Sequence, residues 1–508
     1  MRSKRVGVRI LVSFAASAVR LVLSFFTGLM IARLLKPAAY GDYSFLLGSF
    51  AAIAGLLDMG TSTAFFTFVA QRQRGLRYVA YYGAWLGMQL ALMGGVVAFL
   101  PGRLFGSVWL GQSRDVVLLA LFMTFSMNQL WAFTSQLGES VRDTVGVQAR
   151  NLAGSVLYLG AVLGLAAAGW VSVRALLLLG GVLYLTMAVL YAVRLYRRSV
   201  FPVGEPVSVR DMLADFTAYC YPSVVLASFA YLFLDGYFLQ RFSGSAQQGF
   251  YGIATRFASV ALLGSSATVQ VLWKEVAEAN ALRDVARVRS LLHVFSRGLV
   301  FATAVLGCAL LPFSKEVVGA TVGQAYLQAW VPFSIMMIYP VYQAMNMTHD
   351  VVLLAVAHTR IRNRVMLGFC VLSLVTGYLS LAPRTGIIPG LDWGATGLAA
   401  KVLFCQALQA NAAAYFGCRA IGATFDWKHQ LLVLLVLVPL GFVTRGIGVA
   451  VTGSLAEPLR FPAAVSVAIP LYVAAVVAFV WRVPDVTGLT WDQLRTGARQ
   501  LGIRLRTA

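Results

Sequence analysis

The sequence predicts an all-α polytopic membrane protein with about 14 transmembrane helices, in two pseudo-symmetric six-helix lobes plus two C-terminal helices. Of its 508 residues, 59% are hydrophobic and 12% are charged, whereas soluble domains have about 45–50% apolar and about 25% charged residues. Apolar stretches of about 20 residues, long enough to cross a bilayer, recur along the whole chain. A weak internal repeat relates the two halves. These observations exclude an ordinary soluble enzyme.

The chain begins with a basic segment ahead of an apolar run, a pattern that resembles a signal peptide. The run has no small-residue cleavage site before its turn, so we interpret it as a retained first span. Breaks between the apolar windows then define the remaining spans. The expected spans are Ile10–Leu34, Tyr43–Val69, Tyr78–Leu100, Val116–Phe133, Leu152–Ala168, Ala175–Val193, Phe216–Leu239, Phe250–Trp273, Leu291–Pro312, Trp330–Ala357, Val365–Leu381, Ala395–Phe416, Leu431–Ile447 and Ala463–Val480.

Membrane topology explains most of the net charge of +22. Basic clusters fall in alternate connections, and the positive-inside rule places these connections in the cytoplasm, together with both termini. No long basic stretch interleaved with aromatic residues is present for stacking bases, so we expect no nucleic-acid partner. The five cysteines lie in or beside apolar segments without C-x-x-C spacing, and the four histidines are scattered. We therefore expect neither disulfides nor a metal site.

The two halves align at an offset of 208 residues. The segment Ile31–Phe45 matches Leu239–Ile253, pairing Gly41 with Gly249, and internal repeats are common in transporters. No Walker motif is present, so ATP is not expected to be the direct energy source. The predicted domains are an N-lobe (1–193), a cytoplasmic linker (194–215), a C-lobe (216–422), two added spans (423–483) and a basic amphipathic tail (484–508).

Four segments carry a family resemblance. The stretch Ala32–Ala64 resembles the first hairpin of polysaccharide and O-antigen (Wzx-type) flippases of the multidrug/oligosaccharidyl-lipid/polysaccharide exporter superfamily. Val271–Asp284 is similar to that family's helix-end segment after the eighth span, and Gly323–Trp330 and Ile387–Ala400 are similar to its Gly-x-x-Tyr and Ile-Pro…Gly-x-x-Gly patterns. The resemblance extends in order over most of residues 10–420.

The resemblance implies two bundles around a central cavity and transport by alternating access. It implies that an undecaprenyl-pyrophosphate-linked oligosaccharide moves from the inner to the outer leaflet of the bacterial inner membrane. The expected partners are that glycan, membrane lipids and a polysaccharide polymerase or ligase, with the transporter acting as a monomer. No cofactor is expected beyond a coupling H⁺ or Na⁺.

Charged residues inside expected spans are costly and mark candidate sites. Arginine offers phosphate oxygens a bidentate fork, so cations inside the spans would suit a pyrophosphate. Asp58 and Asp235 are candidates for ion coupling or for balancing that charge, with ion pairing or helix-end capping as the alternatives. The candidate pyrophosphate ligands are Arg20, Arg256, Arg297 and Lys401.

Two other functions remain open at this stage. A multidrug exporter of the same superfamily would share the fold, but exporters of cations favour carboxylates in the cavity, and here basic residues outnumber acidic ones inside the spans. A membrane-embedded glycosyltransferase or polymerase of the same pathway would commonly carry a large outer loop with catalytic groups. The outer loops here are short, so we expect a transporter and not an enzyme.

Overall fold

The computed structural model describes residues 2–70, 75–197, 208–218, 225–226, 229–262, 265–356, 358–385, 388–489 and 493. The described residues form helices and connecting turns, with no strand among them. The prediction of an all-α protein is confirmed. Much of the predicted linker and nearly all of the predicted amphipathic tail beyond residue 489 lie outside the described residues, so the domain boundaries stay predictions.

Nine of the described helices are long and apolar enough to cross a membrane. One of them, Ala16–Asp58, is 43 residues long and contains most of the first two expected spans, separated by a kink. The chain is therefore a multi-pass membrane protein. The number of spans stays a prediction, because several expected spans coincide with helices that are shorter or more polar.

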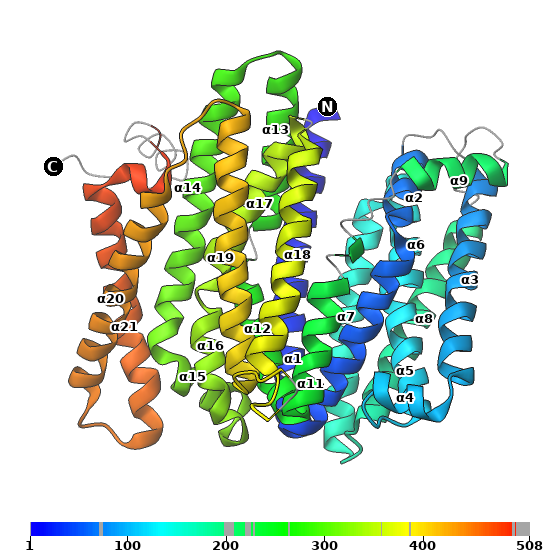
Figure 1. Ribbon diagram of the computed structural model, residues 1–508, viewed down its shortest axis with the longest axis horizontal. Helices are drawn as coiled ribbons and strands as arrows, with labels where there is room; N and C mark the ends of the chain where they lie inside the picture. Colours follow the sequence, from blue (N-terminus) through cyan, green and yellow to red (C-terminus); the bar gives the residue numbers. More distant parts are fainter. Residues whose placement is uncertain are drawn as a thin grey trace. The chain divides into compact units, whose positions relative to one another are not determined.

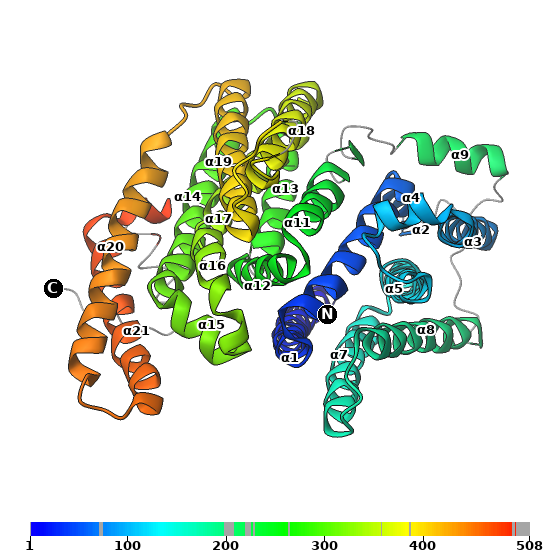
Figure 2. The ribbon, with the colours of Figure 1, turned by 60° about the horizontal axis from the view of Figure 1, so that its bottom comes forward.

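The chain divides into two compact units, one of Met1–Gly249 with Leu381–Asp392 and the other of Phe250–Ser380 with Trp393–Ala508. In unit 1, α5 packs between α3 and α8, and α1 packs along α7 (Figure 2). The elements of unit 1 are α1 (Arg2–Asp58), α2 (Thr61–Ala70), α3 (Leu76–Phe99), α4 (Gly102–Val108), α5 (Arg114–Phe125), η1 (Ser126–Leu130), α6 (Trp131–Ser140), α7 (Thr144–Ala167), α8 (Val173–Arg197), α9 (Val209–Ala218), η2 (Phe229–Leu234) and α11 (Asp235–Ser243).

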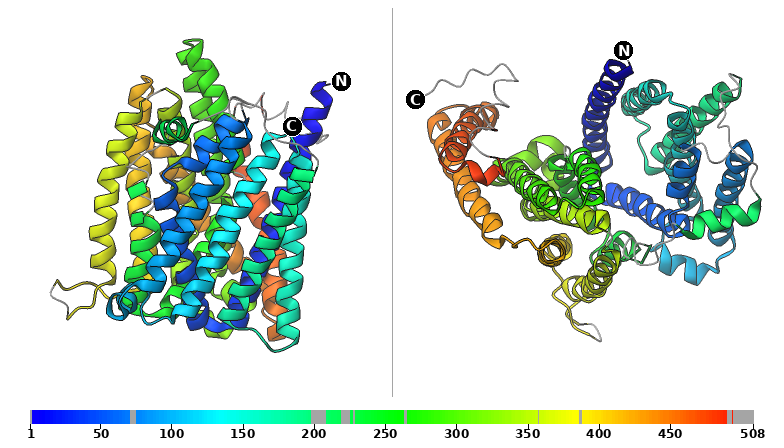
Figure 3. Two further views of the ribbon diagram at one scale, coloured as in Figure 1. Left: turned by 90° about the vertical axis from the view of Figure 1, so that its right-hand side faces the viewer. Right: turned by 90° about the horizontal axis from the view of Figure 1, so that it is seen from above.

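In unit 2, α17 packs along α19 and α14, and α20 packs along α14 and α21 (Figure 1). The long helices within each unit run roughly along one direction (Figure 3). The elements are α12 (Ser245–Ala261, which begins in unit 1), α13 (Ser265–Ala281), α14 (Val285–Leu310), η3 (Leu311–Phe313), α15 (Ser314–Val322), η4 (Gln324–Ala329), α16 (Trp330–Met336), α17 (Tyr339–Ala355), α18 (Thr359–Leu381), α19 (Gly394–Ala420), α20 (Trp427–Thr452), α21 (Glu457–Arg482) and η5 (Pro484–Thr487).

The same backbone break recurs at positions related by the 208-residue offset. Inside α1, Lys36 has φ 63° and ψ 168° and is followed by Pro37. Between α11 and α12, Gly244 has φ 84° and ψ 174°. This region of backbone space is essentially restricted to glycine, so Lys36 is strained where its counterpart Gly244 is not.

The segments that follow these breaks meet in a reciprocal contact within unit 1. A Cβ on Gly41 would collide with the carbonyl oxygen of Ser245, and a Cβ on Gly249 would collide with the carbonyl oxygen of Pro37. Both pairs are related by the offset, which is the geometry of a local two-fold axis. Asp42 adds to the contact by accepting hydrogen bonds from Gln240 Nε2 (2.7 Å) and Ser245 Oγ (2.6 Å). Only glycine permits this approach of two backbones.

Candidate functional site

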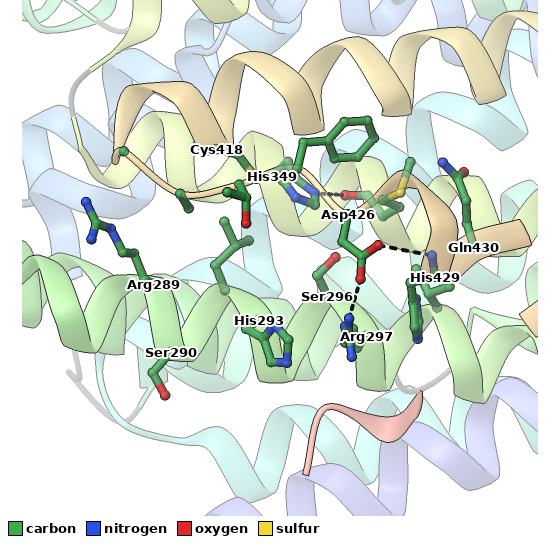
Figure 4. A pocket seen from close by; sticks show the side chains of 17 residues that line it. Arg289, Ser290, His293, Ser296, Arg297, His349, Cys418, Asp426, His429 and Gln430 are labelled. Atoms are coloured by element: carbon green, nitrogen blue, oxygen red, sulfur yellow. Dashed lines mark hydrogen bonds and ion pairs between the residues drawn. The ribbon is translucent and has the colours of Figure 1, made fainter. Parts of the chain in front are cut away.

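A polar cavity of about 490 Å³ opens at one end of unit 2, between α14, α17, the end of α19 and the start of α20 (Figure 4). Its walls carry two arginines, three histidines, an aspartate and several hydroxyl and amide groups. The labelled lining residues are Arg289, Ser290, His293, Ser296, Arg297, His349, Cys418, Asp426, His429 and Gln430. Of the predicted site residues, it contains Arg297 alone.

Arg297 projects from α14 and bridges two carboxylates. One of its terminal nitrogens binds Asp426, directly before α20, and the other binds Asp485 in η5. The second nitrogen also donates to the backbone carbonyl of Asp485 (2.9 Å). The guanidinium is thus already hydrogen-bonded on two sides and ties α14 to two distant segments of unit 2. A phosphate ligand would have to compete with both carboxylates.

The η5 segment lies directly against α14. Gly488 has φ 74°, and a Cβ there would lie 2.9 Å from Cα of Val294 and 3.1 Å from the carbonyl oxygen of His293. Partial burial disfavours ionisation of Asp485, but Arg297, helped by His293, holds the pKa of this carboxyl below its usual range. Asp485 is therefore charged at neutral pH, where its ion pair with Arg297 links η5 to α14.

Three histidines that are far apart in the sequence meet in this cavity. His293 Nε2 lies 3.4 Å from Asp485 Oδ1, and His429 Nε2 lies 2.8 Å from the carbonyl oxygen of Val486. His349 is buried on α17, with Nδ1 2.8 Å from the carbonyl oxygen of Met345. Among the described residues, no cluster of three or more His, Cys, Asp or Glu side chains is placed to hold a metal ion.

Lys401 lies in α19 and is buried, with 4% of its surface exposed. Its ammonium donates a hydrogen bond to Ser373 Oγ of α18 (2.6 Å). It also lies within electrostatic range of Cys370 on the same helix. In this structure Lys401 therefore faces α18 within unit 2. Burial of an ammonium is costly without polar partners, so the contact with Ser373 is energetically significant.

Arg20 and Arg256 belong to different units. Arg20 is exposed on α1 in unit 1, within electrostatic range of Tyr184 on α8. Arg256 is half-buried on α12 in unit 2. Arg256, Lys401 and Arg297 share a unit, yet neither Arg256 nor Lys401 lines the polar cavity. That all four cations bind one pyrophosphate stays a prediction.

The two candidate carboxylates occupy helix ends. Asp58 caps α2: it accepts hydrogen bonds from the Thr61 hydroxyl (2.9 Å), the Ser62 hydroxyl (2.8 Å) and the backbone amides of Gly60 (3.2 Å) and Ser62 (2.9 Å). Asp235 is buried at the start of α11. The geometry of Asp58 matches the capping alternative, and a role in ion coupling stays untested for both residues.

Sequence reasoning missed Asp426, Asp485 and the convergence of the histidines. A local signal exists for Asp426, because aspartate is a favoured N-cap and its carboxylate accepts from the backbone amide of His429. No local signal links it to Arg297, 129 residues away. The three histidines are 56 and 80 residues apart along the chain, so only their packing reveals a shared cavity.

The fold is similar to that of solved membrane transporters of the MOP superfamily and of a lipid II flippase. A structure titled "Lipid II flippase MurJ, inward closed conformation" superposes with a TM-score of 0.68 at 12% identity, covering 94% of this chain and 99% of that chain. An inward-facing multidrug resistance MATE family transporter has a TM-score of 0.59 at 14% identity and covers 81% of this chain. No family model and no curated protein matches the sequence.

A third similar structure is a MOP superfamily transporter from Pyrococcus furiosus whose title reports a binding pocket of reversed polarity and suggests a different function. It has a TM-score of 0.58 at 12% identity and covers 82% of this chain and 95% of that one. Transporters of different stated function thus share this fold. Because the sequence identities are only 12–14%, these structural similarities establish the fold of this chain but not its function.

Proposed function

We propose that this protein is a flippase that moves an undecaprenyl-pyrophosphate-linked oligosaccharide from the inner to the outer leaflet of a bacterial inner membrane. The main support for the proposal is the share of this chain that superposes on a solved flippase. The lipid II flippase is matched over 94% of this chain, whereas the MATE transporter is matched over 81%. The difference, about 66 residues, is close in length to the segment 423–483, which contains α20 and α21.

The charges inside the helices support an anionic substrate. Arg20 is exposed and Arg256 is half-buried. A charged side chain inside an apolar membrane helix is costly, so its presence indicates a function. Fixed cations can balance a diphosphate that a narrow apolar passage cannot solvate. Among the four predicted cations, we assign the first contact with the pyrophosphate to Arg20 and Arg256, which lie inside the first and eighth expected spans.

Multidrug export is the second candidate, because several MATE transporters share the fold. It predicts a substrate without pyrophosphate and transport that does not depend on Arg20 or Arg256. Complementation distinguishes the candidates. The gene is expressed in three bacterial strains, one lacking its polysaccharide flippase, one depleted of its lipid II flippase, and one lacking drug exporters.

We expect rescue of one of the two flippase-deficient strains and no rise in drug resistance. The Arg20→Ala/Arg256→Ala variant should abolish rescue at unchanged membrane content, and the Lys variants should restore it partly because the bidentate fork is lost. The matched control is Arg33→Ala/Arg241→Ala, which removes two arginines from span ends. Drug resistance without rescue of either flippase-deficient strain would overturn the proposal.

A further inference from the structure

A second cavity in unit 2, of about 670 Å³, lies between α18 and α19 and combines apolar walls with a basic mouth. The helices touch where Lys401 binds Ser373 and where Thr376 Oγ1 lies 3.3 Å from Cys405 Sγ. Beyond these contacts they leave a groove. Its lining residues are His358, Ile361, Arg364, Val365, Gly368, Phe369, Leu372, Ala412, Phe416, Arg419 and Ala420.

The charges of the groove are all at one end and of one sign. His358 and Arg364, at the start of α18, lie at the mouth together with Arg419 in the last turn of α19. None of the lining residues is acidic. Arg364 and Arg419 are exposed, and neither has an ion pair or side-chain hydrogen bond in the described part of the chain.

A neighbouring arginine of the same helix, in contrast, has an acidic partner. Arg362 binds Asp350 of α17 through two hydrogen bonds, Nε to Oδ1 at 2.6 Å and a terminal nitrogen to Oδ2 at 3.0 Å. Its charge is therefore compensated inside the unit. Two residues further along α18, Arg364 faces the groove without such a partner.

The depth of the groove matches one leaflet. From Arg364 to Leu372 the helix rises about 12 Å, at about 1.5 Å per residue, and half of the hydrocarbon core is about 15 Å thick. A basic mouth above an apolar slot of this depth complements a phosphate headgroup with a hydrocarbon chain below it. Free phosphate would leave the apolar walls unoccupied.

We propose that the groove between α18 and α19 binds an acidic phospholipid, with Arg364 and Arg419 contacting the phosphate and one acyl chain lying along Val365, Phe369 and Phe416. None of the residues that line the groove is one of the predicted pyrophosphate ligands. The proposed lipid site does not depend on which molecule the protein transports.

The test measures binding of a short-chain fluorescent phosphatidylglycerol to the purified full-length protein in neutral detergent. Removing both groove arginines (Arg364→Ala/Arg419→Ala) should weaken binding by roughly 30-fold, taking the usual contribution of each basic residue near an anionic membrane surface. The matched control is Arg360→Ala, which removes an exposed charge one turn away that does not line the groove. Melting temperatures of all variants check that they fold.

A second variant blocks the groove without altering its charge. Gly368 has open space around the position of a Cβ, so Gly368→Leu should fold and exclude the acyl chain. Phosphatidylcholine of the same chain length should bind more weakly, and glycerol phosphate should not compete. Unchanged binding in the arginine variant or in Gly368→Leu, an equal loss in Arg360→Ala, equal affinity for phosphatidylcholine, or competition by glycerol phosphate would each overturn the proposal.

Discussion

The contact between the two repeat-related glycines can be tested by adding one methyl group to either side. In Gly41→Ala, the new Cβ would collide with the carbonyl oxygen of Ser245 and would lie 2.7 Å from its carbonyl carbon and 2.9 Å from the amide nitrogen of Gly249. Carbon atoms pack at about 3.5–4.0 Å, so the segments must separate by more than about 1 Å. All three obstacles are backbone atoms, which no rotamer change can move. We therefore expect a loss near the upper end of the usual overpacking cost, about 3 kcal/mol.

The assay is thermal unfolding of purified protein in one detergent, where this loss corresponds to a fall of about 3 °C for a chain of 508 residues. Gly249→Ala should have a similar effect, and the double variant should lose less than the sum, because both changes open one contact. Gly48→Ala and Gly55→Ala are matched controls in the same helix α1, since neither has an atom within 4 Å of the new Cβ. Equal melting temperatures for Gly41→Ala and Gly48→Ala would refute the reasoning.

The remaining predictions concern the backbone break, the η5 contact and the cap of α2. Lys36→Gly should stabilise the protein by about 1–3 kcal/mol by relieving strain, and Gly244→Ala should destabilise it by a similar amount in the same thermal assay; opposite signs would contradict the shared conformation. The pKa of Asp485 is lowered in the folded protein, so its stabilising effect is present above its unfolded pKa and is lost as pH falls through the lower folded value. Asp485→Asn should therefore increase hydrogen exchange of residues 484–489 at pH 7, as acidification below about pH 4 does in the wild type. Because Asp485 is largely exposed, the effect should be below about 1 kcal/mol, and identical exchange in variant and wild type would count against the contact with Arg297. Asp58→Ala should lose about 1 kcal/mol, and Asp58→Asn should lose less, because its amide oxygen still accepts the hydrogen bonds made to one carboxylate oxygen. Complete loss of transport in the Asn variant but not in the less stable Ala variant would contradict a purely structural role for this residue.

Local sequence features determined the helices. Hydropathy over about 20 residues depends only on neighbouring side chains and the thickness of a bilayer, so the all-α membrane class could be read directly. The break at Lys36 is marked by the following Pro37, since the residue before a proline avoids the helical region. The alignment paired Gly41 with Gly249, but only the structure shows that the repeat-related segments touch there.

Tertiary structure alone decided what the charged residues contact. The sequence predicted that Arg297 would bind the substrate. In the structure, α14 packs against η5 and the start of α20, and this packing brings two carboxylates from distant parts of the chain to Arg297. The groove between α18 and α19 depends on where two helices touch and where they separate, which hydropathy does not encode. The physical reason is that burial of apolar surface is non-directional, so it specifies that helices form and pack, whereas ion pairs and cavities require particular side chains to meet at hydrogen-bond distance.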